Sequence, residues 1–269
     1  MSWASLSAAA CAVLETADAR EKAKLSRVAV SWIRASAPPI GRQVPGDRPA
    51  RPEKPELLPP NGVPRRRLST GTKGRAALLH ALAHIELNAI DLAWDILARF
   101  TDTPMPAGFY EDWLTVADEE AIHFLLLADR LAELDTLYGD MPAHDGLWQS
   151  AERTSDDLLA RLAIVPMVLE ARGLDVTPQM IERLEAVGDP ASAAILHRIH
   201  DDEIGHVASG RRWFDHLAVE RGFEPREKWQ EIVIERFKGG LKRPFNEPSR
   251  TKADFPADWY EPLVIQLED

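Results

Sequence analysis

The 269-residue sequence has little of several features that mark common functional classes. It has one cysteine, Cys11, which excludes an internal disulfide, a cysteine-ligated cluster and a zinc-finger framework. No run reaches the roughly 18 uninterrupted apolar residues that a membrane span needs. The first residues carry no basic cluster, and the alanine-rich stretch soon meets Glu15, so the sequence does not indicate a signal peptide. These absences predict a cytoplasmic protein.

Basic charge is also scarce, because 32 Lys and Arg residues face 43 Asp and Glu residues, for a formal net charge of −11. This balance argues against a general nucleic-acid or membrane surface. One local basic patch departs from this acidic balance. It consists of Arg65–Arg67, followed by Lys73 and Arg75. No aromatic residues interleave with these arginines, as a stacking site for single strands would require. We therefore interpret the patch as a solvated or salt-bridged arm, with phosphate or nucleic-acid capture as the alternative.

Two Glu-x-x-His strings, Glu120–His123 and Glu203–His206, lie in alanine-containing runs compatible with helix. On a helix this spacing puts both side chains on one face, one turn apart, where they can chelate an ion. With 43 acidic residues and 8 histidines, two such strings prove little by themselves. Glu86 and Glu170 lie in two further helix-compatible runs, which gives the order Glu, Glu-x-x-His, Glu, Glu-x-x-His. This order predicts a metal site, with surface salt-bridging carboxylates as the alternative.

Further side chains are candidates for orienting the metal-binding histidines. Such histidines usually donate their other ring N–H to a carboxylate, a carbonyl or a water. Glu119 precedes His123 by four residues and Asp202 precedes His206 by four, a spacing at which helical side chains meet. The alternative for both carboxylates is a solvated charge. His84 is a third candidate, but an ordinary hydrogen-bonded histidine is the better interpretation of it.

Apolar periodicity predicts an all-α fold. Pro166 is expected to kink the third core helix, and Thr177 with Pro178 to begin a short helix after it. Gly205 and Gly210 on the fourth core helix indicate either close approach of a neighbouring helix or room for a substrate. The main helices are expected at about 5–16, 19–35, 74–100, 108–139, 147–172, 191–222 and 225–237.

Composition divides the chain into one domain with extensions. Repeated prolines after Ala37 exclude regular helix in an arm that we expect to lie extended. The last residues are too aromatic for a free tail, so we expect them to pack on the bundle. The expected parts are an N-terminal helical segment at 1–36, the proline-rich arm at 37–72, a four-helix bundle at 73–222 and a C-terminal extension at 223–269.

Six residues together resemble the ligand set of the ferritin-like di-iron carboxylate superfamily: Glu86, Glu120, His123, Glu170, Glu203 and His206. The strings HIELNAIDLAWD, DEEAIHF, VLEARGLDVTP and DDEIGH further resemble a bacterial family of ferritin-like proteins known mainly as a domain of unknown function. This narrower resemblance covers about Gly74 to Asn246, with Pro166 as a departure. It implies a ferritin-like four-helix bundle that binds metal through the six residues.

The superfamily resemblance implies chemistry without naming a substrate. It implies that two Fe ions, or Mn or a mixed Mn/Fe pair, use O₂ and an electron donor to hydroxylate or otherwise oxidise a small organic molecule. One alternative is ferritin-like or rubrerythrin-like iron oxidation or peroxide scavenging, and another is a metal-stabilised binding protein without turnover. A tRNA hydroxylase belongs to the superfamily, which makes tRNA a minor alternative partner. No membrane partner is expected.

Overall fold

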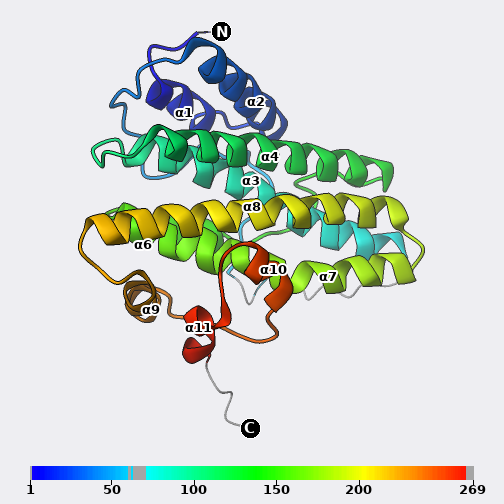
Figure 1. Cartoon of the computed structure of the whole chain (residues 1–269). Helices are drawn as coiled ribbons and strands as arrows, with labels where there is room; N and C mark the ends of the chain where they lie inside the picture. Colours follow the sequence, from blue (N-terminus) through cyan, green and yellow to red (C-terminus); the bar gives the residue numbers. More distant parts are fainter. Residues whose placement is uncertain (1, 60–61, 63–70, 265–269) are drawn as a thin grey trace. The chain divides into compact units, whose positions relative to one another are not determined.

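The computed structural model describes residues 2–59, 62 and 71–264 (Figure 1). These residues form helices, turns and loops, with two isolated β-bridges, Leu57–Ala143 and Leu241–Val264. The predicted all-α class is therefore confirmed. The helices are α1 Leu6–Leu14, α2 Ala19–Ser36, α3 Thr72–Arg99, α4 Ala107–Glu133, α5 Gly146–Glu152, α6 Leu158–Ile164, α7 Ala171–Ala186, α8 Pro190–Glu220, α9 Pro225–Arg236, α10 Glu247–Lys252 and α11 Ala257–Tyr260.

The chain divides into two compact units. Unit 1 comprises Met1–Gln149 and Arg183–Ile195, and unit 2 comprises Ser150–Glu182 and Leu196–Asp269. In unit 1, α3 packs along α4, while α1 packs on α3 and α2 packs on α4. In unit 2, α9 packs on α6 and α11 packs on α9. Each unit therefore has its own core.

Helix α3 is the core helix of unit 1. It is the one helix in the described part of the chain that is long and apolar enough to cross a membrane, and 83% of its apolar window is buried within the chain. Leu79, Ala83 and Ile90 on its apolar stripe are fully buried, and Glu86 lies on the same stripe with 3% exposure. The sequence pattern therefore places a carboxylate inside the core.

Buried ion pairs fix the described part of the proline-rich arm to unit 1. Lys22 Nζ lies 2.5 Å from Asp91 Oδ1 and donates to the carbonyl of Ala50 at 2.8 Å. Arg51 lies 2.9 Å from Asp91 Oδ2 and donates to Asn88 Oδ1 at 2.8 Å. Lys22 and Asp91 are almost fully buried, so the Lys22 ammonium depends on the Asp91 carboxylate for compensation. The arm contains no helix over residues 37–59, as predicted.

Two predicted helix boundaries are wrong. Helix α4 ends at Glu133, because Asp135 takes a left-handed conformation (φ 54°) and a turn follows, so the helix does not reach 139. The predicted helix at 147–172 is broken into α5 and α6. Helix α6 begins at Leu158. The side chain of Asp157, the N-cap residue before it, accepts a hydrogen bond from the backbone N–H of Leu159 at 3.1 Å.

The predicted kink at Pro166 is a π-helical segment, Val165–Glu170, between α6 and α7. Proline has no N–H to donate to the preceding turn, and wider turns relieve this mismatch. The indole N–H of Trp229 donates to the carbonyl of Ala163 at 3.2 Å, next to the irregular segment. A Cβ on Gly210 of α8 would lie 2.3 Å from Pro166 Cβ, whereas one on Gly205 would have no atom within 4 Å. Close helix approach therefore explains Gly210.

The predicted helix start at Thr177 and Pro178 is also wrong, because α7 continues through both residues to Ala186. Pro178 cannot donate to the carbonyl of Leu174, four residues earlier. That carbonyl instead accepts a hydrogen bond from Asn246 Nδ2 at 3.1 Å. The helix survives its proline because a side chain from the C-terminal segment satisfies the backbone oxygen.

The C-terminal segment packs on α7 through Arg250. Its guanidinium donates to both carboxylate oxygens of Asp175, at 2.8 and 2.7 Å. The same guanidinium lies 4.3 Å from the ring centroid of Tyr260 and 4.9 Å from that of Phe245. Arg250 is 3% exposed. A bidentate, aromatic-enclosed ion pair therefore joins the C-terminal segment to unit 2.

Candidate metal centre

Helices α3 and α4 bring three predicted ligands together in unit 1. Glu86 comes from α3, and Glu120 and His123 come from α4, with one ligand atom of each within 4.8 Å of the others. His123 Nδ1 lies 3.2 Å from Glu86 Oε2 and 3.5 Å from Glu120 Oε2. Glu120 and His123 are fully buried. Two carboxylates and one imidazole thus converge in a closed core.

The electrostatics of this cluster fit a cation. Burial raises the pKa of Glu86 well above its usual range, and the negative charge of Glu120 raises it further, against the opposing effect of His123. Two carboxylates this close cannot both ionise cheaply without a positive charge between them. A divalent ion supplies that charge, and oxygen and imidazole donors suit iron, manganese and zinc. The donor set therefore fits a transition metal ion.

Unit 2 carries a second set of the same residue types. His206 Nδ1 lies 3.7 Å from Glu203 Oε1 on α8, and their side chains are 2% and 12% exposed. Glu170 is half-buried at the last position of the π-helical segment. The three-residue spacing again puts carboxylate and imidazole on one helix face. Each unit thus holds one single Glu and one Glu-x-x-His pair.

His84 has an ordinary hydrogen-bonded role. Its Nδ1 lies 2.9 Å from the hydroxyl of Tyr138, and its Nε2 lies 3.2 Å from the carbonyl of His144. Burial lowers the pKa of His84 to about 3, so the ring is neutral. Because a carbonyl only accepts, Nε2 carries the proton and Nδ1 accepts from Tyr138. His84 therefore ties the loop after α4 to α3.

The two carboxylates predicted to orient the histidines lie partly exposed on α4 and α8. Glu119 is half-buried. Asp202 Oδ2 lies 3.5 Å from Arg198 Nε, and its side chain is 26% exposed. Their proposed hydrogen bonds to the metal-binding histidines stay a prediction.

Arg75 of the basic patch is salt-bridged. Arg75 donates to Asp189 Oδ2 at 3.0 Å, and Arg130 donates to Asp189 Oδ1 at 2.8 Å. Asp189 also accepts from the backbone N–H of Ser192 at the start of α8. Arg65–Arg67 lies outside the described residues. Arg75 thus pairs with the carboxylate that caps the start of α8.

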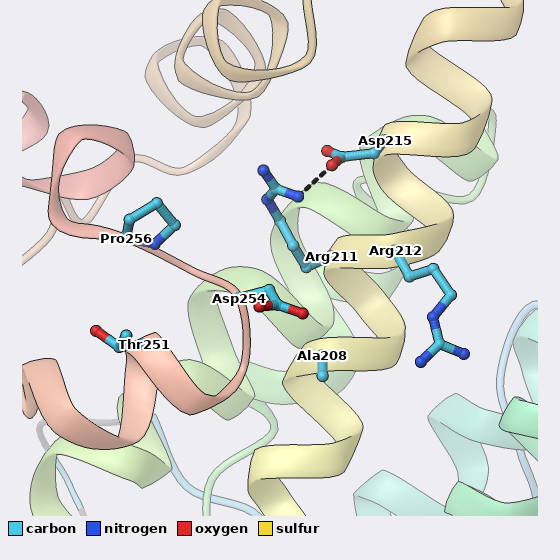
Figure 2. A pocket seen from close by; sticks show the side chains of 7 residues that line it. All are labelled: Ala208, Arg211, Arg212, Asp215, Thr251, Asp254 and Pro256. Atoms are coloured by element: carbon cyan, nitrogen blue, oxygen red, sulfur yellow. Dashed lines mark hydrogen bonds and ion pairs between the residues drawn. The ribbon is translucent and has the colours of Figure 1, made fainter.

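Sequence reasoning missed two groups of side chains. Tyr138 gave no signal, because its contact with His84 depends on the turn that follows α4. Arg211 and Asp215 on α8 form an ion pair beside a cavity in unit 2 (Figure 2). Their four-residue spacing on a helix indicates an ion pair, but nothing in the sequence indicated the cavity.

Comparisons with known proteins identify one family and one relative. The profile of a family described as "Protein of unknown function (DUF455)" matches residues 15–261. A Haemophilus influenzae protein described as "Uncharacterized protein" is 42% identical over 222 residues, which span 78% of this chain and 75% of that protein. No solved structure matches the chain.

Proposed function

Since the chain belongs to the DUF455 family, we propose from its own side chains that it is a di-iron oxidoreductase that uses O₂ to hydroxylate or otherwise oxidise an organic substrate. The observation that carries the proposal is the buried cluster of Glu86, Glu120 and His123. Burying two carboxylates side by side costs stability unless a cation compensates them. A bound metal ion is the compensation that the residue types favour.

The proposal joins the two sets of ligands into one dinuclear centre. Glu170, Glu203 and His206 are proposed as the further ligands of this centre. The support is chemical, since each unit offers one Glu and one Glu-x-x-His pair. The fold proposed for this ligand set is a ferritin-like four-helix bundle. The same six residues hold either Fe or Mn.

The residues of the chain have distinct roles in this proposal. The four carboxylates would neutralise the metal charges, and the two histidines would add neutral nitrogen donors. When bound, the pair of iron ions supplies the redox chemistry with O₂. The full burial of Glu120 and His123 keeps bulk water away from the reacting groups. The π-helical segment sets the position of Glu170, and such segments are frequent at functional sites.

The partners remain those expected from the sequence. A small organic substrate and an electron donor are proposed, and the cytoplasm is the proposed location. Arg75 is engaged with Asp189, which reduces the basic surface available to tRNA.

Oxygen uptake by iron-loaded protein tests the activity. The metal-free full chain is loaded with Fe(II) under anaerobic conditions, and O₂ consumption is followed with and without a chemical reductant. We expect uptake by the wild type and a reduction of about 100-fold or more in Glu120→Gln. Glu111→Gln on the same helix is the matched control, because Glu111 is a surface residue paired with Arg34.

The outcomes separate the proposal from its alternatives. Iron-loaded wild type that consumes no O₂ would contradict the oxidoreductase and favour a metal-stabilised binding protein. Oxidation and retention of many more than two irons per chain would favour storage. Uptake that is equal in Glu120→Gln and in the wild type would show that the reaction does not use this cluster.

A further inference from the structure

A cavity of about 580 Å³ lies in unit 2 between α8 and the segment from α10 to α11 (Figure 2). It is lined by Arg211 and Asp215 of α8 and by Thr251 and Asp254 of the C-terminal segment. Arg211 and Asp215 lie about 140° and 180° around the helix axis from His206. The cavity is therefore on another face of α8 than the candidate metal ligands.

The Arg211 side chain is held in a fixed orientation in this cavity. Its guanidinium carbon lies 3.7 Å from the ring centroid of Trp259. Its Nη1 donates to Asp215 Oδ2, as the dashed line in Figure 2 shows. The Arg211 and Asp215 side chains are 15% and 32% exposed. Stacking on one side and an ion pair at one edge orient the planar donor fork before any ligand arrives.

Both members of the pair keep hydrogen-bonding capacity. Arg211 Nε and Asp215 Oδ1 are buried atoms that have no hydrogen-bond partner among the described residues. Burial raises the pKa of Asp215 to about 6, although Arg211 opposes the shift. A partly buried carboxylate in this state gains from an added positive charge. The remaining edge of a guanidinium is suited to a carboxylate.

Residues of both charges line the cavity. Arg211 and Arg212 are the basic ones, and Asp215 and Asp254 are the acidic ones. In Figure 2 the Arg212 side chain points away from that of Arg211, so the two do not form a clamp for one phosphate. Neither a lone anion nor a lone cation matches such a lining. A ligand that carries both charges does.

We propose that this cavity binds a free α-amino acid. The Arg211 guanidinium receives the carboxylate, and the carboxylates of Asp215 and Asp254 receive the ammonium group. The Thr251 hydroxyl offers a further hydrogen bond. The volume lies within the range of small-molecule sites, roughly 300–1,000 Å³. The proposal is independent of the metal centre.

Isothermal titration calorimetry on the full chain tests the ligand class. Each common amino acid is titrated separately, and any that binds is compared with the amine that lacks its carboxylate and the acid that lacks its ammonium group. Inorganic phosphate is titrated as well. We expect at least one amino acid to bind, with both truncated analogues weaker by about tenfold or more.

Two variants and one control assign the binding to the cavity. Asp254→Asn removes one charge from an exposed residue, and asparagine tolerates its left-handed backbone (φ 54°). Arg211→Gln removes the carboxylate partner. Arg198→Gln removes a similar Arg–Asp pair four residues apart on α8, away from the lining residues. We expect the first two to weaken binding by about tenfold or more and the control to leave it unchanged.

Several outcomes would overturn the proposal. The first is that no amino acid binds. The second is that the deaminated acid, the decarboxylated amine or phosphate binds as tightly as the amino acid. The third is that the affinity for the amino acid is unchanged in both Asp254→Asn and Arg211→Gln. Circular dichroism of each variant shows whether it is folded. If Arg211→Gln loses its stacking on Trp259 and unfolds unit 2, binding by the Asp254→Asn variant alone decides the test.

Discussion

The two units carry the same types of candidate ligand on different kinds of helix. In unit 1, Glu86, Glu120 and His123 lie on regular α-helices and are almost fully buried. In unit 2, Glu170 ends a π-helical segment, and the side chain of Glu203 is 12% exposed. Similar ligand chemistry can therefore rest on very different backbone geometry.

The two units are also stabilised in different ways. In unit 1, buried side chains pair with each other, as Lys22 does with Asp91. In unit 2, side chains support irregular backbone, as Trp229 does at Ala163 and Asn246 does at Leu174. Both irregular regions contain a proline within a helical run. At Pro178, the side chain of Asn246 bonds the Leu174 carbonyl that the proline leaves without a backbone donor, and the helix therefore continues through the proline.

The largest effect is expected from breaking the buried pair of unit 1. Asp91→Ala leaves the Lys22 ammonium buried without its carboxylate, which should lower the free energy of unfolding by about 3–5 kcal/mol. Asp129→Ala is the control, because Asp129 pairs with Arg20 on the surface and should cost about 0–1 kcal/mol. Urea unfolding followed by circular dichroism measures both. Equal losses would show that the buried pair is not what stabilises unit 1.

The next largest effect on stability is expected from substitution of two glycines of α8. Gly210→Ala should destabilise the protein by about 1–3 kcal/mol, because the new Cβ would meet Pro166 at 2.3 Å. Gly205→Ala should stabilise it by up to about 1 kcal/mol, because no atom lies within 4 Å and alanine favours helix. Unfolding in urea gives both values. If Gly210→Ala proves as well tolerated as Gly205→Ala, the close packing against the π-helical segment is disproved.

A smaller effect tests how α7 accommodates Pro178. Asn246→Ala should cost about 1–2 kcal/mol, because it removes both the bond to the Leu174 carbonyl and the N-cap of α10. In a Pro178→Ala background the same change should cost about 0.5–1 kcal/mol less, because residue 178 regains an N–H for that carbonyl. A double-mutant cycle measures the difference. The same cost in both backgrounds would contradict the mechanism.

The smallest effect is a pH dependence at the cavity of unit 2. The pKa of Asp215 is raised from 3.8 to about 6, so its neutral form favours the folded state. That contribution is complete below pH 3.8 and is lost as the pH rises through about 6. Relative to Asp215→Asn, the wild type should therefore lose up to about 1 kcal/mol between pH 4 and 6.5, after allowance for partial exposure. A stability difference that stays constant, or that rises with pH, would contradict the shift.

Much of unit 1 was predictable from the sequence. The apolar stripes fixed α1 to α3 closely and placed Glu86 in the core, and the i,i+3 spacing placed Glu120 beside His123. These features depend on local periodicity, which the sequence shows directly.

The irregular features of unit 2 were not predictable. The continuation of α7 through Pro178 depends on Asn246, and the packing of Pro166 depends on Gly210. The orientation of Arg211 at the cavity depends on Trp259, which stacks on Arg211 from a distant part of the chain. Local patterns carry no information on such long-range contacts.

Metal content tests the central claim most directly. Untagged full-length protein from iron-replete cells is assayed by elemental analysis as wild type, Glu120→Gln, Glu203→Gln and the control Glu111→Gln. The account predicts about two Fe or Mn per chain in the wild type and the control, with loss of metal in the other two, since the proposed ligand set includes both Glu120 and Glu203. A wild type without metal, or a Glu203→Gln variant with its full complement, would contradict it.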